Sequence, residues 1–253
     1  MKIIDTHAHL CDSSFDGDLK EVLDRAAGSG VCGVVTVGED LSDAKKNLQL
    51  SEKYSMIRPA AGLYPDNLDQ NRAEDMICWI RENRSRLWAI GEVGLDFWIA
   101  KEICDRELQS NIFSMFIDLS IELDLPLNVH SRSAGRHAIE ILISRGAKRV
   151  QLHAFDGKFG KAMAAVDAGF LFSVPPSVVR SHQKQKLVKN LPLSCLMVES
   201  DSPVLGPDPV ERNEPANCRI SIETIARLKG VPVQTVAEEV FNNTCRFYGR
   251  NIG

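Results

Sequence analysis

The sequence predicts an α/β protein folded as a (β/α)8 TIM-like barrel, and three observations support this prediction. Eight short apolar segments alternate with amphipathic helical segments along the chain. The length of 253 residues is typical of one such barrel. Histidines and carboxylates recur where the apolar segments end, and a barrel brings all of its strand ends to one mouth. We expect a single domain over residues 1–253, with its site at the C-terminal face of the strands.

The expected strands are short and rich in branched apolar residues, at 2–8, 32–38, 57–64, 87–95, 125–131, 149–155, 169–175 and 195–201. Helical spacing of apolar residues predicts helices at 18–30, 42–54, 73–86, 106–124, 135–146, 160–169, 181–191, 221–230 and 232–249. A doubly wound open sheet is the alternative, but it usually has fewer strands and a G-x-G-x-x-G turn after the first one. The stretch DTHAHLCDSSFDGD at the end of the first strand holds no such turn, which favours the barrel.

Composition limits the class of protein. Hydrophobic residues make up 44% of the chain and charged residues 25%, which are ordinary values for a globular protein. The 30 basic and 34 acidic residues give a net charge of −4, which argues against a protein that coats nucleic acid by bulk positive charge. A local grip on a phosphate through metal ions remains compatible with this charge.

The cysteines and the N-terminal segment predict the compartment. The seven cysteines are odd in number and form no C-x-x-C pair, as expected for thiols in a reducing compartment. The sequence begins with a strand instead of a signal-like apolar run, and no stretch reaches membrane-spanning length. We therefore expect a cytoplasmic protein that does not contact membranes, and the sequence indicates no obligate protein partner.

The first predicted strand ends in DTHAHL, which places His7 and His9 two positions apart. Residues two apart on an extended strand point to the same side, so both imidazoles face one way. Two converging imidazoles suit a divalent metal ion, although two polar residues at a strand end would give the same pattern. Four more side chains that bind metals lie at the ends of the fourth, fifth, sixth and eighth strands: Glu92, His130, His153 and Asp201.

Six ligands are more than one catalytic ion needs, because such an ion keeps a position open. We therefore expect two divalent ions, and Glu92 as their bridge, since a carboxylate has two oxygens to share. The remaining ligands divide into two groups: His7, His9 and Asp201 for one ion, and His130 and His153 for the other. Four imidazoles favour Zn²⁺, Mn²⁺, Co²⁺ or Ni²⁺, while Mg²⁺, the further candidate, prefers oxygen ligands.

Three other polar residues are expected outside this ligand set. His137 and His182 belong to helical segments and are expected at the surface. Glu199 shares a strand face with Asp201, and it is either a partner of the ligands or a polar residue beneath the mouth.

Seven segments together resemble the motifs of one family in order and spacing: DTHAHL, AIGEVGLDF, LPLNVHSR, LHAF, ESDSPVL, RNEPAN and NNTCRFYG. They resemble the TatD family of metal-dependent deoxyribonucleases, part of the wider amidohydrolase superfamily. The resemblance extends from Asp5 to Gly249. It implies a TIM-like barrel with one or two metal ions that hydrolyses phosphodiester bonds, and the ligands of the family fall on the same six residues.

The resemblance also implies a substrate and a mechanism. The substrate would be DNA, as a single strand or at its ends, cleaved by an exonuclease through metal-activated water. Asp201 would take a proton from this water and later give it to the leaving 3′-oxygen. Arg132 follows His130 by two positions and would bind a substrate phosphate, or would form a salt bridge at the barrel rim instead.

One motif departs from the family pattern. The third strand of family members usually ends in a G-x-H-P-H motif, whereas this chain reads GLYPDN, with Tyr64 and Asp66 in place of the histidines. Tyr64 would donate a hydrogen bond to a substrate phosphate, as the first histidine is thought to do, or would only fill the same space. Because of this departure, a substrate other than that of the better-known family members stays open as an alternative.

Other functions are compatible with the same ligands. An amidohydrolase-type enzyme or an aminoacyl-tRNA deacylase would cleave a C–N or ester bond there, while the complete ligand set argues against a non-catalytic scaffold. A basic run after the seventh strand would track a DNA backbone or is only a solvated helix face. This run contains Arg180, Lys184, Lys186 and Lys189.

Overall fold

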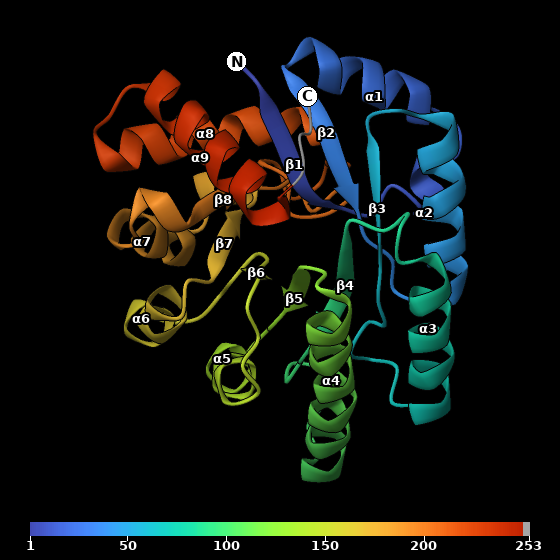
Figure 1. Ribbon diagram of the computed structural model, residues 1–253. Helices are drawn as coiled ribbons and strands as arrows, with labels where there is room; N and C mark the ends of the chain where they lie inside the picture. The colour runs from blue at the N-terminus through green and yellow to red at the C-terminus, as the bar shows by residue number, and fades with distance from the viewer. Residues whose placement is uncertain (250–253) are drawn as a thin grey trace.

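The structure is a computed structural model that describes residues 1–249, so residues 250–253 of the expected domain lie outside the described part. Eight parallel strands follow one another around a barrel in the order of the sequence (Figure 1). The strands are β1 Ile3–Ala8, β2 Val31–Thr36, β3 Ile57–Ala61, β4 Ala89–Gly94, β5 Leu127–His130, β6 Val150–Leu152, β7 Leu171–Val174 and β8 Leu196–Val198. Every predicted strand is present, and the TIM-like barrel is confirmed.

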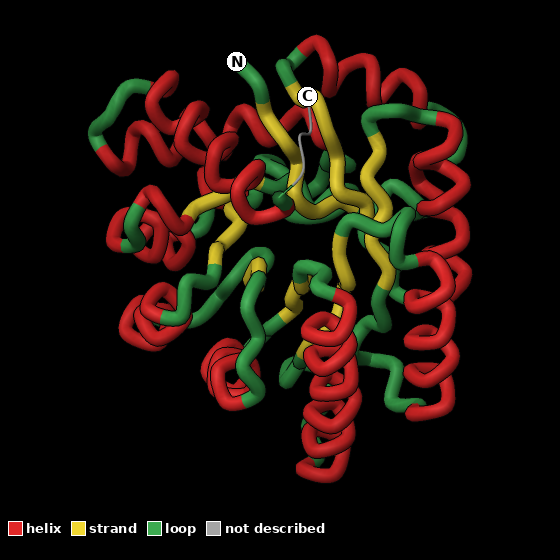
Figure 2. Tube along the Cα trace, viewed as in Figure 1, coloured by secondary structure: helices red, strands yellow, loops and turns green. Residues whose placement is uncertain are grey.

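The α-helices surround the strands on the outside, as Figure 2 shows. Within residues 1–249 they are α1 Leu19–Gly28, α2 Leu41–Lys53, α3 Gln70–Asn83, α4 Ile103–Leu123, α5 Gly135–Ser144, α6 Phe159–Asp167, α7 His182–Asn190, α8 Cys218–Lys229 and α9 Val233–Tyr248. Among these described helices, none has the length and apolar character needed to cross a membrane. All seven cysteines are free thiols.

Three helices begin three residues earlier than predicted, namely α3, α4 and α8. The first turn of α3 is polar and exposed, so apolar spacing does not reveal it. Asp69 caps the N-terminus of this helix, because its side chain accepts hydrogen bonds from the backbone N–H groups of Asn71 and Arg72.

The barrel closes between β8 and β1, at the end where the candidate ligands lie. The backbone N–H of Asp201 donates to the carbonyl of His7 at 2.8 Å, and that of His9 donates to the carbonyl of Ser202, also at 2.8 Å. Deeper in the barrel the Thr6 hydroxyl donates to the carbonyl of Val198. His7 and Asp201, the first and last candidate ligands in the sequence, thus become neighbours in space.

Polar side chains fill part of the barrel interior below this closure. The Asn128 amide donates to the carbonyl of Thr6, and the Gln151 amide donates to the Thr6 and Ser173 hydroxyls. Tyr248, near the end of α9, donates its hydroxyl hydrogen to the Gln151 amide oxygen at 3.1 Å. These buried groups satisfy one another, and they support the strand ends from below.

Candidate metal centre

The structure brings the six predicted ligands together at one end of the barrel. His7, Glu92 and His130 lie within β1, β4 and β5, while the other three lie one to three residues beyond β1, β6 and β8. All except His7 line a cavity of about 440 Å³ at the mouth of the barrel, the mouth cavity. His7 lies beneath them with no exposed surface.

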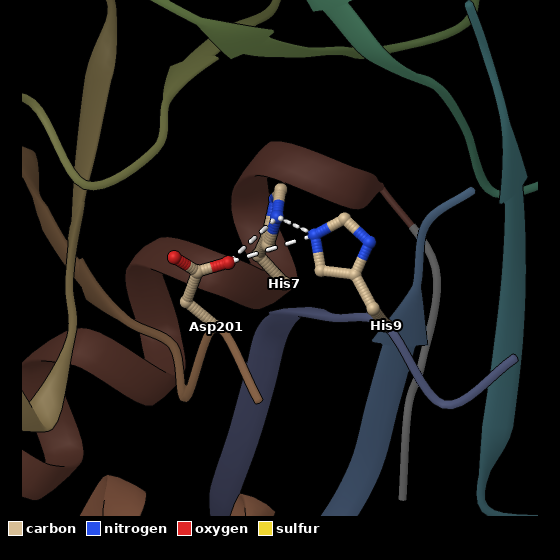
Figure 3. Close-up of side chains that lie close together, drawn as sticks. All are labelled: His7, His9 and Asp201. Carbon is tan, nitrogen blue, oxygen red and sulfur yellow. Dashed lines mark hydrogen bonds and ion pairs between the residues drawn. The ribbon is translucent and has the colours of Figure 1, made fainter. Parts of the chain in front are cut away.

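The first group of ligand atoms belongs to His7, His9 and Asp201. The two Nε2 atoms of the histidines lie 3.2 Å apart. Asp201 Oδ1 lies 3.3 Å from Nε2 of His7 and 3.6 Å from Nε2 of His9. Figure 3 shows the three side chains converging on one point. Asp201 has a left-handed backbone, with φ of 55°, and the closure between β8 and β1 holds it there.

The second group consists of His130, His153 and one oxygen of Glu92. Nδ1 of His130 and Nε2 of His153 lie 3.1 Å apart. Glu92 Oε1 lies 2.7 Å from the first of these nitrogens and 2.8 Å from the second. The other oxygen, Oε2, lies 3.3 Å from His9 Nε2 and 3.7 Å from His7 Nε2. Each oxygen of Glu92 therefore faces a different group.

This donor set fits divalent cations. Imidazole nitrogens that approach each other to about 3.1–3.2 Å, with carboxylate oxygens between them, offer lone pairs to a shared positive charge. The groups are also desolvated: the exposed fraction of the five ligands other than His9 is at most 8%. Buried charges are stable in proteins when they are paired or bind a metal.

The electrostatics of the pocket favour ionised carboxylates beside one neutral ring. Burial disfavours the charged form of Asp201, but hydrogen bonds from His7 and His9 outweigh it and lower the pKa of this carboxyl. Burial likewise opposes ionisation of Glu92, yet the neighbouring imidazoles of His153 and His130 hold its pKa well below the usual value. Burial and the charge of His7 lower the pKa of His153 to about 4, so this ring is neutral at pH 7.

Two polar residues outside the predicted set orient the histidines. Asn128 Oδ1 lies 2.8 Å from His7 Nδ1, which places a proton on Nδ1 and turns Nε2 toward the other candidate ligands. Asp96 Oδ2 lies 3.1 Å from His130 Nε2, which likewise turns Nδ1 toward Glu92. A carboxylate or amide oxygen behind a histidine is a common support of metal ligands. Asp96 belongs to the GLDF segment and follows the end of β4 by two residues. A carboxylate just beyond a strand end is the sequence feature that could have indicated its place near the candidate ligands.

The predicted substrate contacts lie in different surroundings. Tyr64 lines the mouth cavity, and its hydroxyl donates to Asp96 Oδ2 at 3.3 Å. Arg132 also lines this cavity, whereas Asp66 is exposed outside it. In the basic run, Lys184 is half-buried at the cavity wall, where Nζ donates to the carbonyl of Ala154 at 2.7 Å. The other members of the run, Arg180, Lys186 and Lys189, are exposed.

The family model for TatD related DNases matches residues 4–249. The deoxyribonuclease TATDN3 of Homo sapiens is 43% identical to this chain, over 97% of this chain and 94% of its own length. The chain belongs to the TatD family. An uncharacterized metal-dependent hydrolase of Methanocaldococcus jannaschii is 33% identical, over 100% and 99% of the two lengths. The crystal structure of the TatD homologue YJJV of Escherichia coli superimposes with a TM-score of 0.89, at 25% identity and 98% coverage of both chains.

Three further sequence expectations for this TatD family member can now be compared with the structure. His137 and His182 are exposed on α5 and α7, as predicted. Glu199 is fully buried under the mouth cavity, with Oε2 4.0 Å from His153 Nδ1 and Oε1 accepting the N–H of Ala154 at 2.8 Å. Glu199 therefore supports the segment that carries His153, one of the two roles left open by the sequence.

Proposed function

We propose that this protein is a metal-dependent deoxyribonuclease that hydrolyses phosphodiester bonds of DNA as an exonuclease. The observation that supports this most directly is the position of Glu92, whose two oxygens face two separate groups of ligand atoms. A carboxylate shared in this way is typical of paired ions in enzymes that cleave phosphodiesters. Family membership and the names of the relatives point to the same reaction.

We infer two divalent ions, of Zn²⁺, Mn²⁺ or Mg²⁺. His7, His9 and Asp201 would hold one and His130 and His153 the other, with Glu92 between them. Such ions lower the pKa of water and offset the charge that develops on the phosphoryl oxygens. The abundance of imidazole favours the first two metals over Mg²⁺.

Asp201 would act as the catalytic base. Its carboxylate is ionised at neutral pH, because His7 and His9 stabilise the charge. It lines the mouth cavity with 5% of its surface exposed, so it can reach a water and a scissile bond there. It would accept the proton of the attacking water and pass it to the leaving 3′-oxygen.

The cations of the cavity wall would bind the substrate. Arg132 and Lys184 line the mouth cavity and offer positive charge to phosphates near the ligands. Tyr64 would contribute to substrate binding indirectly, through Asp96, because the Tyr64 hydroxyl donates a hydrogen bond to the Asp96 carboxylate. The overall charge of −4 makes this local positive charge the relevant attraction for DNA.

The test is release of nucleotides from end-labelled single-stranded DNA by protein stripped of metal and then supplied with Zn²⁺, Mn²⁺ or Mg²⁺. We expect cleavage with metal only, and its loss in His153→Gln. His137→Gln is the matched control, because His137 is exposed on α5. Turnover of cyclic amides or aminoacyl esters without cleavage of DNA would refute the proposal and favour the amidohydrolase or deacylase alternative.

A further inference from the structure

An exposed tryptophan lies against Arg132, one of the residues that line the mouth cavity. Trp98 lies in the loop between β4 and α4, and 57% of its surface is exposed. Its neighbour Ile99 is 47% exposed. Large exposed apolar side chains beside a cavity are often binding residues, because leaving them in water is unfavourable.

The loop that holds Trp98 is tied to the candidate metal centre. Asp96 Oδ1 accepts hydrogen bonds from the backbone N–H of Trp98 at 2.8 Å and of Ile99 at 3.0 Å. The other oxygen of the same carboxylate faces His130. The backbone N–H of Phe97 donates to the carbonyl of Arg132 at 3.0 Å. The position of Trp98 is therefore fixed relative to the ligands.

Two cations lie against the Trp98 ring. The guanidinium carbon of Arg132 lies 5.0 Å from the ring centre, and Nζ of Lys101 lies 4.8 Å from it. Arg132 also lines the mouth cavity, so it connects the aromatic ring with the ligands. An exposed aromatic ring flanked by cations is the arrangement by which proteins bind single-stranded nucleic acid: bases stack on the ring, and cations contact the phosphates.

We propose that Trp98 stacks on a nucleobase beside the scissile phosphate, while Arg132 binds a neighbouring phosphate. This inference rests on the proposed function, since it takes DNA as the substrate. It makes Trp98 a specificity residue for unpaired, base-bearing nucleotides. A base inside a duplex must first leave its stack, and an abasic position offers the ring nothing to stack on.

Binding to zinc-loaded protein tests the stacking directly. The probes are single-stranded phosphorothioate oligonucleotides that resist cleavage, one with all bases and one abasic at its terminal positions. We expect the base-bearing probe to quench tryptophan emission, because Trp98 is exposed whereas Trp79 and Trp88 are partly buried against the core. Trp98→Ala should weaken its binding about 5- to 140-fold and leave the abasic probe unchanged. Trp98→Phe should keep most of the affinity.

Cleavage assays separate this inference from the function on which it rests. On base-bearing single-stranded DNA, Trp98→Ala should raise KM with little change in kcat, while a small chromogenic phosphodiester should be hydrolysed as before. Ile143→Ala is the control, because it removes another exposed apolar side chain, near the C-terminal end of α5. If wild-type protein cleaves DNA and Trp98→Ala binds both probes as tightly as wild type, the stacking role is wrong and the function stands. If wild-type protein neither binds nor cleaves DNA, both are wrong, and the exposed ring serves another partner.

Discussion

Replacing Asp96 by Asn tests whether a single carboxylate sets the proton position on His130. The carboxylate accepts from His130 Nε2 at 3.1 Å on one side and from the N–H groups of Trp98 and Ile99 on the other. Asn has the same shape but only one acceptor oxygen. In one orientation its NH2 faces Nε2, which must then accept, so the proton moves to Nδ1. The nitrogen that faces Glu92 then has no free lone pair for an ion.

The opposite orientation of the Asn side chain is also unfavourable. Its oxygen would then accept from His130, but its NH2 would face the N–H groups of Trp98 and Ile99, which would lose their acceptor. Each lost hydrogen bond costs roughly 0.5–1.5 kcal/mol. Loss of a partner behind a metal-bound histidine typically weakens metal binding about 10- to 100-fold, or about 1.4–2.8 kcal/mol. A histidine in the wrong tautomer costs about 10⁴ in kcat in serine proteases, which sets an upper limit for the loss of activity.

Calorimetric titration of metal-stripped protein with Zn²⁺ measures this loss. We expect one of two binding steps to weaken in Asp96→Asn, while the step assigned to His7 and His9 changes little. Asp66→Asn is the matched control, because it removes the same charge from an exposed position outside the mouth cavity. Equal loss of affinity in both variants would mean that net charge is responsible, and unchanged binding in Asp96→Asn would refute the reasoning about the tautomer.

Three further predictions follow from the same geometry. Glu92→Gln keeps the side-chain volume but should weaken both binding steps in the same titration, because each oxygen faces one group; an effect on one step alone would contradict the bridge. Tyr64→Phe removes the donor to Asp96 and should lower kcat/KM on DNA about tenfold; a silent change would mean that the ring only fills space. Chelation should lower the melting temperature in calorimetry by roughly 5–11 °C for each ion removed, since one ion at 100-fold excess over Kd contributes about 2.7 kcal/mol. A melting temperature that does not respond to chelator would argue against resident ions.

The strands and the convergence of the six candidate ligands could be predicted, because both follow from the alternation of apolar strand segments and helical segments along the chain. A barrel of parallel strands brings every C-terminal strand end to one face, so a histidine such as His130, which ends its strand, must lie near one such as His153, which follows another. No long-range knowledge of packing is needed for this step. The structure adds the closure between β8 and β1, which places Asp201 beside His7.

The supporting residues could not be predicted, because their roles depend on distances between loops and strands. Asn128 precedes His130 in the same strand, but only the closed barrel brings it to His7. Lys184 reads as one member of a basic helix surface, and only the folded structure reveals that it reaches the cavity and the carbonyl of Ala154. The orientation of Trp98 could not be predicted, since the loop after β4 has no periodic pattern.

Asp96 connects the Trp98 loop with His130, and this connection limits which changes the loop can tolerate. The same carboxylate holds the backbone of the Trp98 loop and the ring of His130. A movement of the loop that breaks one set of hydrogen bonds therefore changes the support of the other. If DNA fixes this loop by stacking on Trp98, it also fixes the partner of a metal ligand, so DNA and metal must strengthen each other's binding by the same factor. Loop residues that only contact solvent can change freely, whereas a change that displaces the backbone N–H groups of Trp98 or Ile99 would disturb Asp96 and, through it, His130.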